Sequence, residues 1–155
     1  MTVDDLLILT EDQIDYASLD LDLLAELARQ ATEPFIATSA LASLSSRDEL
    51  TAQDVCEEIL RRPDGDTHLR AYAMTTLYSL SPERGLRQME QCADSDIDER
   101  LLGSVIENVM SDIDRFKSGH RELVSKLIAK ARRVSAERFS DPDEVQRFIA
   151  VFASQ

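Results

Sequence analysis

Apolar residues recur at every third or fourth position along most of the chain, which is the spacing of an amphipathic helix. The clearest run is Ile97, Leu101, Val105 and Val109. The one alternating stretch, LDLDL at residues 19–23, continues directly into helical spacing, so no convincing strand remains. The pattern predicts an all-α fold with helices over residues 19–31, 33–45, 52–62, 67–80, 82–93, 97–112, 119–137 and 142–154, and a short turn or helix at 4–16.

The prolines mark the ends of these predicted helices. Pro34, Pro82 and Pro142 follow or nearly follow capping residues, and proline in the first turn of a helix loses no hydrogen bond. Pro63 comes after the 52–62 helix and predicts a stop. Because the connections are short, we expect consecutive helices to pack as antiparallel neighbours.

A weak repeat runs through the helical segments. ATSALASLSS at residues 37–46 matches AMTTLYSLSP at 73–82, and SVIENVMS at 104–111 is a third copy. On this pattern, residues 19–140 resemble the HEAT-repeat and HEAT-like family of α-solenoids. The resemblance implies a solenoid of about four antiparallel helix pairs, in which stacking buries the apolar face of each pair. A plain helical bundle of the same helices is the alternative.

The length of 155 residues predicts one domain that is large enough to bury a core without a metal or a disulfide. Within the single all-helical domain 1–155 we expect an acidic N-terminal segment at 1–18, helix-pair repeats at 19–140 and a C-terminal capping helix at 141–155. Hydrophobic residues make up 43% and charged residues 30% of the chain, which indicates a slim body with much surface.

The N-terminal sequence and the cysteines predict a cytoplasmic protein. No secretory apolar region precedes Asp4 and Asp5, and no run approaches the roughly 20 apolar residues that span a membrane. Cys56 and Cys92 fall in apolar helical patterns, so we expect buried structural thiols in a reducing compartment.

Charge is distributed unevenly along the chain, whose formal net charge is −13. Residues 1–28 contain eight carboxylates and no lysine or arginine, whereas residues 115–138 contain eight bases and two acids. An acidic body repels nucleic acid and anionic lipid and attracts a basic protein. The basic helix predicted at 119–137 has no interleaved aromatic residues, and we expect it to pair with adjacent acidic helices. Contact with an acidic protein or self-association is the alternative, ahead of nucleic-acid binding.

Asp94, Asp96 and Asp98 alternate as the first ligands of an EF-hand calcium loop do. That loop also requires glycine at its sixth position and glutamate at its twelfth, but the chain has Glu99 and Val105 there. The stretch instead predicts a helix start, with Asp96 as N-cap and with Asp98 and Glu99 in the first turn. No metal or other cofactor is expected.

Other candidate chemistry is sparse. His68 and His120 have no second histidine or cysteine at the spacing of a metal site, so surface or cap positions are expected for both. No glycine-rich phosphate loop or nucleophile elbow is present in the sequence, and we do not expect an enzyme.

Two acidic turns form the candidate binding site. With a repeat near 30 residues, the turns at 64–66 and 94–99 should lie on the same edge, so that their charges add. The candidate partner-binding residues are Asp64, Asp66, Glu57, Glu58, Glu90, Asp94, Asp96, Asp98 and Glu99. The alternative is that these residues serve only capping and solubility.

These features predict a non-enzymatic protein-binding module whose partner is a basic protein. By class, the chain resembles immunity proteins with HEAT-like folds from contact-dependent and related toxin systems. That resemblance implies a toxin inhibitor that neutralises a basic, nuclease-type toxin through an acidic surface. A generic HEAT-like adaptor or scaffold is the second interpretation, and a HEAT-like nucleic-acid-binding protein or enzyme is the third. We expect a monomer or a weak homo-oligomer.

Overall fold

Every regular element in the described part of the chain is helical. The computed structural model describes residues 1–153, and it confirms the all-α prediction over them. The α-helices are α1 (Val3–Leu7), α2 (Leu21–Gln30), α3 (Pro34–Arg47), α4 (Glu49–Leu60), α5 (Thr67–Leu80), α6 (Pro82–Asp94), α7 (Glu99–Ser111), α8 (Ile113–Ser118), α9 (Arg121–Arg132) and α10 (Pro142–Phe152). Short 3-10 helices are η1 (Glu11–Gln13), η2 (Tyr16–Ser18) and η3 (Ala136–Arg138).

Side-chain caps explain where most of the long helices begin. Asp66, for example, accepts a hydrogen bond from the backbone N–H of Leu69 at 2.9 Å. Such a bond satisfies a backbone donor that has no partner inside the helix. Proline occupies the first position of α3, α6 and α10, as predicted: Pro34, Pro82 and Pro142.

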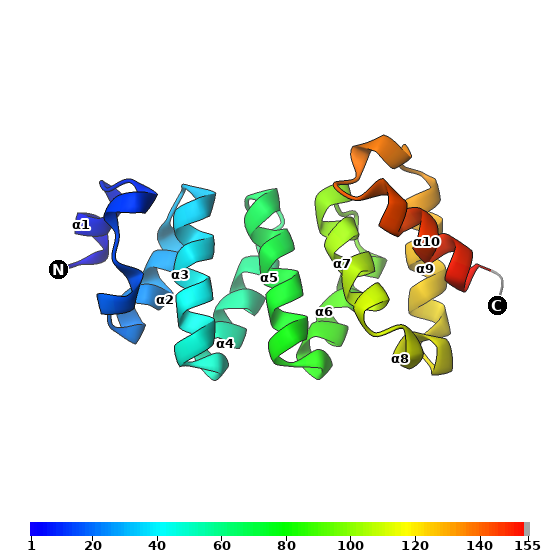
Figure 1. The fold of residues 1–155 in the computed structure, drawn as a ribbon, viewed down its shortest axis with the longest axis horizontal. Helices are drawn as coiled ribbons and strands as arrows, with labels where there is room; N and C mark the ends of the chain where they lie inside the picture. The colour runs from blue at the N-terminus through cyan, green and yellow to red at the C-terminus, as the bar shows by residue number, and fades with distance from the viewer. Residues whose placement is uncertain (154–155) are drawn as a thin grey trace.

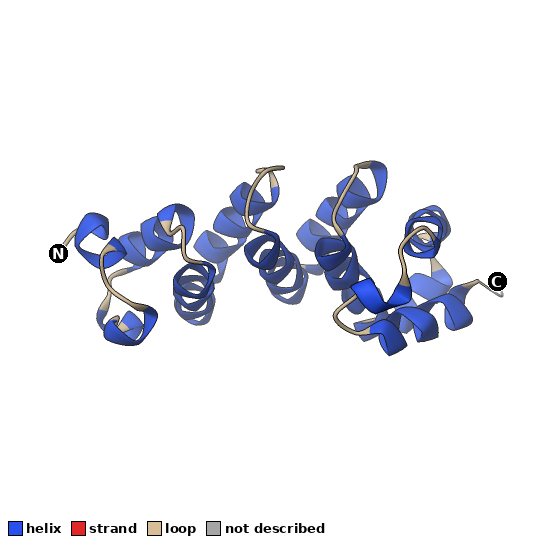
Figure 2. Cartoon of the chain, turned by 90° about the horizontal axis from the view of Figure 1, so that it is seen from above, coloured by secondary structure: helices blue, strands red, loops and turns tan. Residues whose placement is uncertain are grey.

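The helices lie in two rows along the longest axis of the molecule (Figures 1 and 2). Helices α3, α5 and α7 form the front row in the view of Figure 1, and α2, α4, α6 and α9 lie behind them. Helix α10 packs beside α7 and α9, and the two chain ends lie at opposite ends of the rows. We call the exposed side of α3, α5 and α7 the front face. Figure 2 shows η1, η2 and α10 projecting beyond α5 on this side.

Apolar side chains between the rows form the core. Leu41 on α3 and Leu77 on α5, which occupy equivalent positions in the sequence repeat, are both 0% exposed. The cluster of buried side chains continues from Leu6 near the N-terminus to Phe152 at the end of α10. Neighbouring helices therefore share one continuous core along the length of the molecule.

Several predicted helix boundaries were wrong. The helix predicted at 52–62 begins at Glu49, because Asp48 directly after α3 acts as its N-cap. The helix predicted at 97–112 ends at Ser111, because Asp112 has φ −142° and ψ 51°, which are not helical angles. The separate helix α8 that follows was not predicted.

The two ends of the chain also differ from the prediction. The segment 4–16 contains α1 and η1 rather than one turn or helix. The helix predicted at 119–137 ends at Arg132, where the N–H of Arg133 bonds to the carbonyl of Lys130 and tightens the last turn. The predicted end of the last helix at residue 154 lies outside the described residues.

Both cysteines are buried, as predicted. Burial raises the pKa of the Cys56 thiol to about 12 and that of Cys92 to about 11, because an apolar environment disfavours the thiolate. These thiols are packing residues, and a raised pKa makes them poor nucleophiles.

Candidate functional site

The two predicted acidic turns lie along the same edge of the molecule, where neighbouring helices are connected. The loop before α5 and the loop before α7 both lie at the upper edge in Figure 1. We call the predicted site the acidic edge, which consists of Glu57, Glu58, Asp64, Asp66, Glu90, Asp94, Asp96, Asp98 and Glu99. Its carboxylates fall into four groups: two that pair with arginine, two that pair with the basic part of the chain, two helix caps, and three exposed to solvent.

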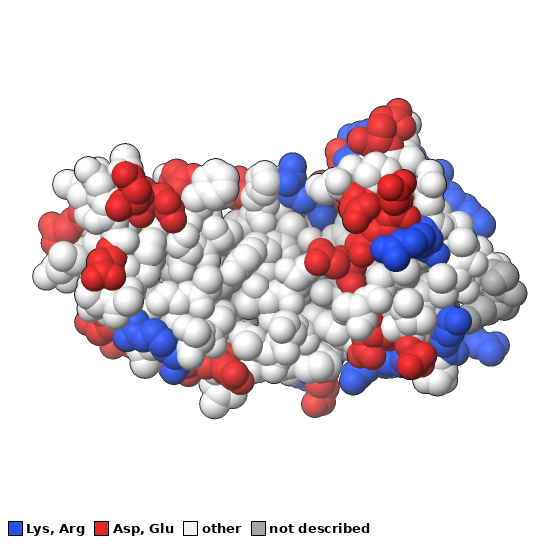
Figure 3. Space-filling model, viewed as in Figure 1, with Lys and Arg blue, Asp and Glu red and all other residues white. Residues whose placement is uncertain are grey.

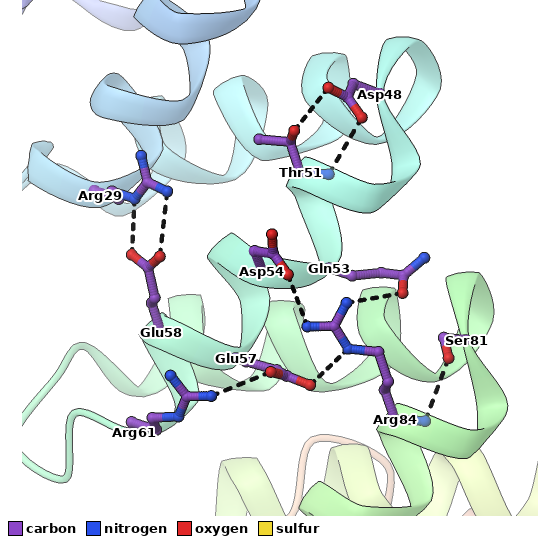
Figure 4. A network of polar contacts seen from close by, with 10 residues as sticks. All are labelled: Arg29, Asp48, Thr51, Gln53, Asp54, Glu57, Glu58, Arg61, Ser81 and Arg84. Carbon is purple, nitrogen blue, oxygen red and sulfur yellow. Dashed lines mark hydrogen bonds and ion pairs between the residues drawn. The ribbon is translucent and has the colours of Figure 1, made fainter.

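Glu57 and Glu58 on α4 are paired by arginines of the same chain (Figure 4). Glu57 accepts a hydrogen bond from Arg84 Nε at 2.7 Å and lies 3.2 Å from Arg61 Nη2. Glu58 accepts from Arg29 Nε at 2.7 Å and Nη2 at 3.2 Å, which is a bidentate pair. The hydrogen bond from Arg84 holds the pKa of Glu57 below its ordinary value. These two carboxylates therefore link α4 to its neighbours in the rear row.

Asp94 and Glu99 are paired by the basic part of the chain. Lys126 Nζ lies 2.6 Å from Asp94 Oδ1, and Arg138 Nη2 lies 2.9 Å from Glu99 Oε1. The hydrogen bond to Asp94 is the main cause that raises the pKa of Lys126. The contact of Lys126 on α9 agrees with the expected pairing between the basic helix and the acidic residues beside it, whereas Arg138 lies in η3, after that helix.

Asp66 and Asp98 are helix caps. Asp98 accepts a hydrogen bond from the backbone N–H of Leu101 at 2.9 Å, as Asp66 does from Leu69. The prediction that Asp96 caps this helix was wrong, because α7 begins one residue after Asp98 and Asp96 lies too far outside. The carboxylates of the two caps are turned toward their own helices.

Asp64, Glu90 and Asp96 are exposed to solvent. Over residues 1–153 their carboxylates make no hydrogen bond or ion pair. Most of the acidic edge is therefore already engaged by arginine, lysine or backbone N–H groups of the same chain.

A second acidic group, which was not predicted from the sequence, lines a pocket where α7 meets α10. The pocket has a volume of about 270 Å³. Glu107 on α7 and Asp141 and Glu144 at the start of α10 supply carboxylates, and Tyr72 and Phe139 supply aromatic surface. We call this pocket the α7–α10 groove.

The charge of the α7–α10 groove is not balanced inside the protein. Burial raises the pKa of Glu144, and the negative charges of Glu107 and Asp141 raise it further. The side chain of Glu144 is 20% exposed, and its contact with Arg147 is long, at 4.0 Å. Within residues 1–153, no ion pair engages Glu107 or Asp141. A cation that entered the groove would relieve this repulsion.

The groove was missed because its parts are far apart in the sequence. Glu107 lies on the polar side of the strongest apolar stripe and gave no signal of its own. Asp141 was interpreted only as a helix cap, a role that it does have, since it accepts a hydrogen bond from the Glu144 N–H at 3.1 Å. Only the packing of α10 on α7 brings the three carboxylates together.

Beside the groove, the front face is uncharged over α3 and α5 (Figure 3). A shallow pocket of about 310 Å³ on this surface is lined by Ala42, Ser45, Thr76 and Ser79, among others. Tyr72 and Thr75 line both this pocket and the α7–α10 groove, so the two form one continuous surface.

No three His, Cys, Asp or Glu side chains among the described residues lie close enough to share a metal ion. No helix in the same part of the chain combines the length and the apolar character needed to cross a membrane.

Comparisons with protein-family models, with curated proteins and with solved structures gave no match.

Proposed function

We propose that the chain is a non-enzymatic, HEAT-like α-solenoid that binds a basic protein. The two rows of helices, with α3, α5 and α7 side by side, support a solenoid rather than a closed bundle. The observation that carries the binding function is the acidic charge that remains after internal pairing. The formal net charge is −13, and the carboxylates of the α7–α10 groove have the long 4.0 Å contact between Glu144 and Arg147 as their recorded ion pair among residues 1–153.

Neutralisation of a nuclease-type toxin is the specific role that we propose. Such a toxin has a basic cleft for its nucleic-acid substrate, and an inhibitor with a strongly acidic surface can occupy that cleft. Complementary charge accelerates the encounter and disfavours partners of the wrong sign. Two features support this role: the resemblance to immunity proteins with HEAT-like folds and the net charge of −13. The partner is defined only as a basic protein.

Affinity capture from the native host, at low and at high salt, tests this function. We expect one basic protein to be retained at low salt and lost at high salt, because exposed charge pairs are screened. We also expect its gene to lie directly before the gene of this chain, and co-production of the chain to restore growth that the partner arrests. Retention of a neutral or acidic partner alone, or of none, would contradict the proposal.

A generic adaptor is the second candidate function, and the uncharged surface over α3 and α5 favours it. An adaptor that binds through this surface would hold its partner equally well at low and high salt. Binding of labelled duplex DNA at moderate salt would contradict both candidates and would favour a nucleic-acid-binding protein.

A further inference from the structure

The carboxylates of the α7–α10 groove are held together by rigid elements. Glu107 projects from α7, whose neighbouring residues Val105 and Ile106 are fully buried. Asp141 is fixed by its capping bond to the Glu144 N–H, and Val145 anchors the same turn of α10 in the core. The backbone positions that carry the three side chains are therefore fixed, although their charges repel.

The same chain shows how a comparable set of acceptors is satisfied elsewhere. Around Arg84, the oxygens of Glu57, Asp54 and Gln53 accept three hydrogen bonds from one guanidinium, at 2.7, 2.9 and 3.1 Å (Figure 4). That cluster takes its arginine from the neighbouring helix α6. The α7–α10 groove is also lined by three carboxylates, but the ion pair recorded for them in residues 1–153 is the long contact of Glu144 with Arg147, at 4.0 Å.

The remaining walls of the groove fit a planar cation. Tyr72 lines it and is partly exposed, whereas Phe139 lines it but is only 4% exposed; guanidinium groups stack on aromatic rings such as that of Tyr72. Arg100 also lines this pocket, where its Nη1 lies 3.0 Å from Nδ1 of His68. Glu107 lies seven positions after Arg100 on α7, which is about 10 Å along the helix axis. The contact with His68 therefore directs Arg100 away from Glu107.

We propose that the α7–α10 groove binds an arginine side chain of a basic protein partner, and that the uncharged surface over α3 and α5 receives the small and polar residues beside that arginine. This inference rests on the proposed function and assigns it to a surface. Charge complementarity selects the occupant: an arginine would supply the donors that the groove lacks, in the bidentate geometry that carboxylates prefer. The acidic edge, whose carboxylates are mostly paired internally, would then contribute mainly long-range attraction.

A short peptide tests this inference without the natural partner. The probe is acetyl-Gly-Ser-Arg-Ser-Gly-amide, and its control contains citrulline, a neutral analogue of arginine with nearly the same shape. Binding is followed by changes in the backbone amide NMR signals of the ¹⁵N-labelled chain. We expect the arginine peptide to shift signals around Tyr72, Gly103 and Val145, and the citrulline peptide to bind at least tenfold more weakly.

Two charge-matched double variants locate the site. Glu107→Gln with Glu144→Gln removes two charges from the groove, and Glu49→Gln with Glu83→Gln removes two exposed charges from α4 and α6 in the rear row. We expect the first pair to weaken binding of the arginine peptide at least tenfold and the second to change it less than twofold. Glu→Gln keeps the side-chain volume in both variants, and in the groove it also relieves repulsion. Both variants should therefore unfold at the wild-type temperature or above it. The single variant Glu107→Gln, at an exposed position, should also weaken binding and serves if the double variant does not fold.

Three outcomes would overturn the inference: equal binding of the citrulline peptide, equal loss in both double variants, or no signal change around the groove. The host capture experiment reports separately on the proposed function. A basic partner whose binding ignores the groove variants would leave the proposed function standing and remove this site. If the arginine peptide binds the groove but the captured partner is not basic, the groove would remain an arginine-binding site and the proposed function would be contradicted.

Discussion

Arg84 on α6 reaches across to α4, where it donates hydrogen bonds to Glu57, Asp54 and Gln53 (Figure 4). These bonds raise the pKa of Arg84 above its ordinary value and lower that of Glu57. The side chains of Arg84 and Glu57 are only 21% and 15% exposed, so solvent screens their contact weakly. At the scale of single residues, Glu57, which the sequence predicted to bind a partner, instead helps to hold α4 against α6.

The Arg84→Gln variant should lower the free energy of unfolding by about 2 to 3 kcal/mol, because it leaves Glu57 partly buried with a weaker partner. Urea unfolding at neutral pH measures the loss. The control is Arg138→Gln, which breaks the more exposed pair with Glu99 and should cost less than about 1 kcal/mol. Equal losses in the two variants would show that the Arg84 cluster is no more than a surface contact.

Gly85 marks a close approach of α5 and α6. A Cβ atom at Gly85 would lie 2.5 Å from Tyr78 Cα and 2.9 Å from Tyr78 Cβ, so one helix would have to move. Gly85→Ala should therefore reduce the free energy of unfolding by about 2 kcal/mol or more. Gly103→Ala on α7 is the control: its nearest new contact is Phe139 Cδ1 at 3.8 Å, and alanine should stabilise the helix by about 0.5 to 1 kcal/mol. Thermal melts in which both variants shift in the same direction would contradict this packing.

Stability should fall at alkaline pH because three buried protons are held more tightly in the folded chain. Burial raises the pKa of Cys56 from 9.0 to about 12 and of Cys92 from 9.0 to about 11. Burial, with the hydrogen bond to Asp112, raises the pKa of Tyr78 from 10.0 to about 12. The unfolded chain releases these protons first, so their contribution is complete below about pH 9 and is lost as the pH approaches 12.

For Cys56 alone the shift corresponds to roughly 4 kcal/mol. Urea midpoints measured from pH 8 to pH 11.5 should therefore decline steeply in the wild type and less steeply in Cys56→Ala. Parallel curves for the two proteins would show that this thiol does not contribute to alkaline unfolding.

At the scale of helices, single caps decide where each element starts. Asp98 bonds to the N–H of Leu101, whereas Asp96 makes no contact of this kind within residues 1–153. Asp98→Ala should lower the free energy of unfolding by about 1 kcal/mol, and Asp96→Ala should change it by less than about 0.5 kcal/mol. Chemical denaturation of the two variants measures the difference. A larger loss for Asp96→Ala would restore the start that the sequence pattern predicted.

The existence of the long helices could be predicted from the sequence, and several of their ends could not. The apolar spacing is continuous within each long helix, so α5 matches its predicted range of 67–80 and α6 ends one residue after its predicted range. The start of α4 was missed because Glu49 and the 71% exposed Leu50 lie outside the apolar pattern, and the cap Asp48 alone defines it. Boundaries depend on one local hydrogen bond, which a periodic pattern does not report.

The candidate site was harder to predict for a different reason. The sequence identified acidic residues, but whether a carboxylate is free depends on which cation packs beside it. Glu57 is paired by Arg84, and Asp94 by Lys126, and each cation lies on a different helix that is far away in the sequence. Glu107 and Glu144 remain uncompensated because no such residue faces them closely in the described part of the chain. Pairing across helices is a property of tertiary packing, which a single sequence does not display.

At the scale of the whole molecule, an uncharged surface lies between charged ends. Figure 3 shows the centre of the front face without lysine, arginine, aspartate or glutamate, and acidic groups beside it over α7 and α10. A partner that spans this face would meet uncharged residues in the middle and carboxylates at both ends, which would attract a basic partner.

The most direct test of this account compares the captured partner's affinity for the two charge-matched double variants. Both lose two negative charges, one pair from the α7–α10 groove (Glu107→Gln with Glu144→Gln) and one pair from α4 and α6 in the rear row (Glu49→Gln with Glu83→Gln). Isothermal titration calorimetry at low salt should show at least tenfold weaker binding for the groove variant, and less than twofold weaker binding for the rear-row variant. Equal weakening would show that only the net charge of the chain matters, and a larger loss in the rear-row variant would place the partner on the other side of the molecule.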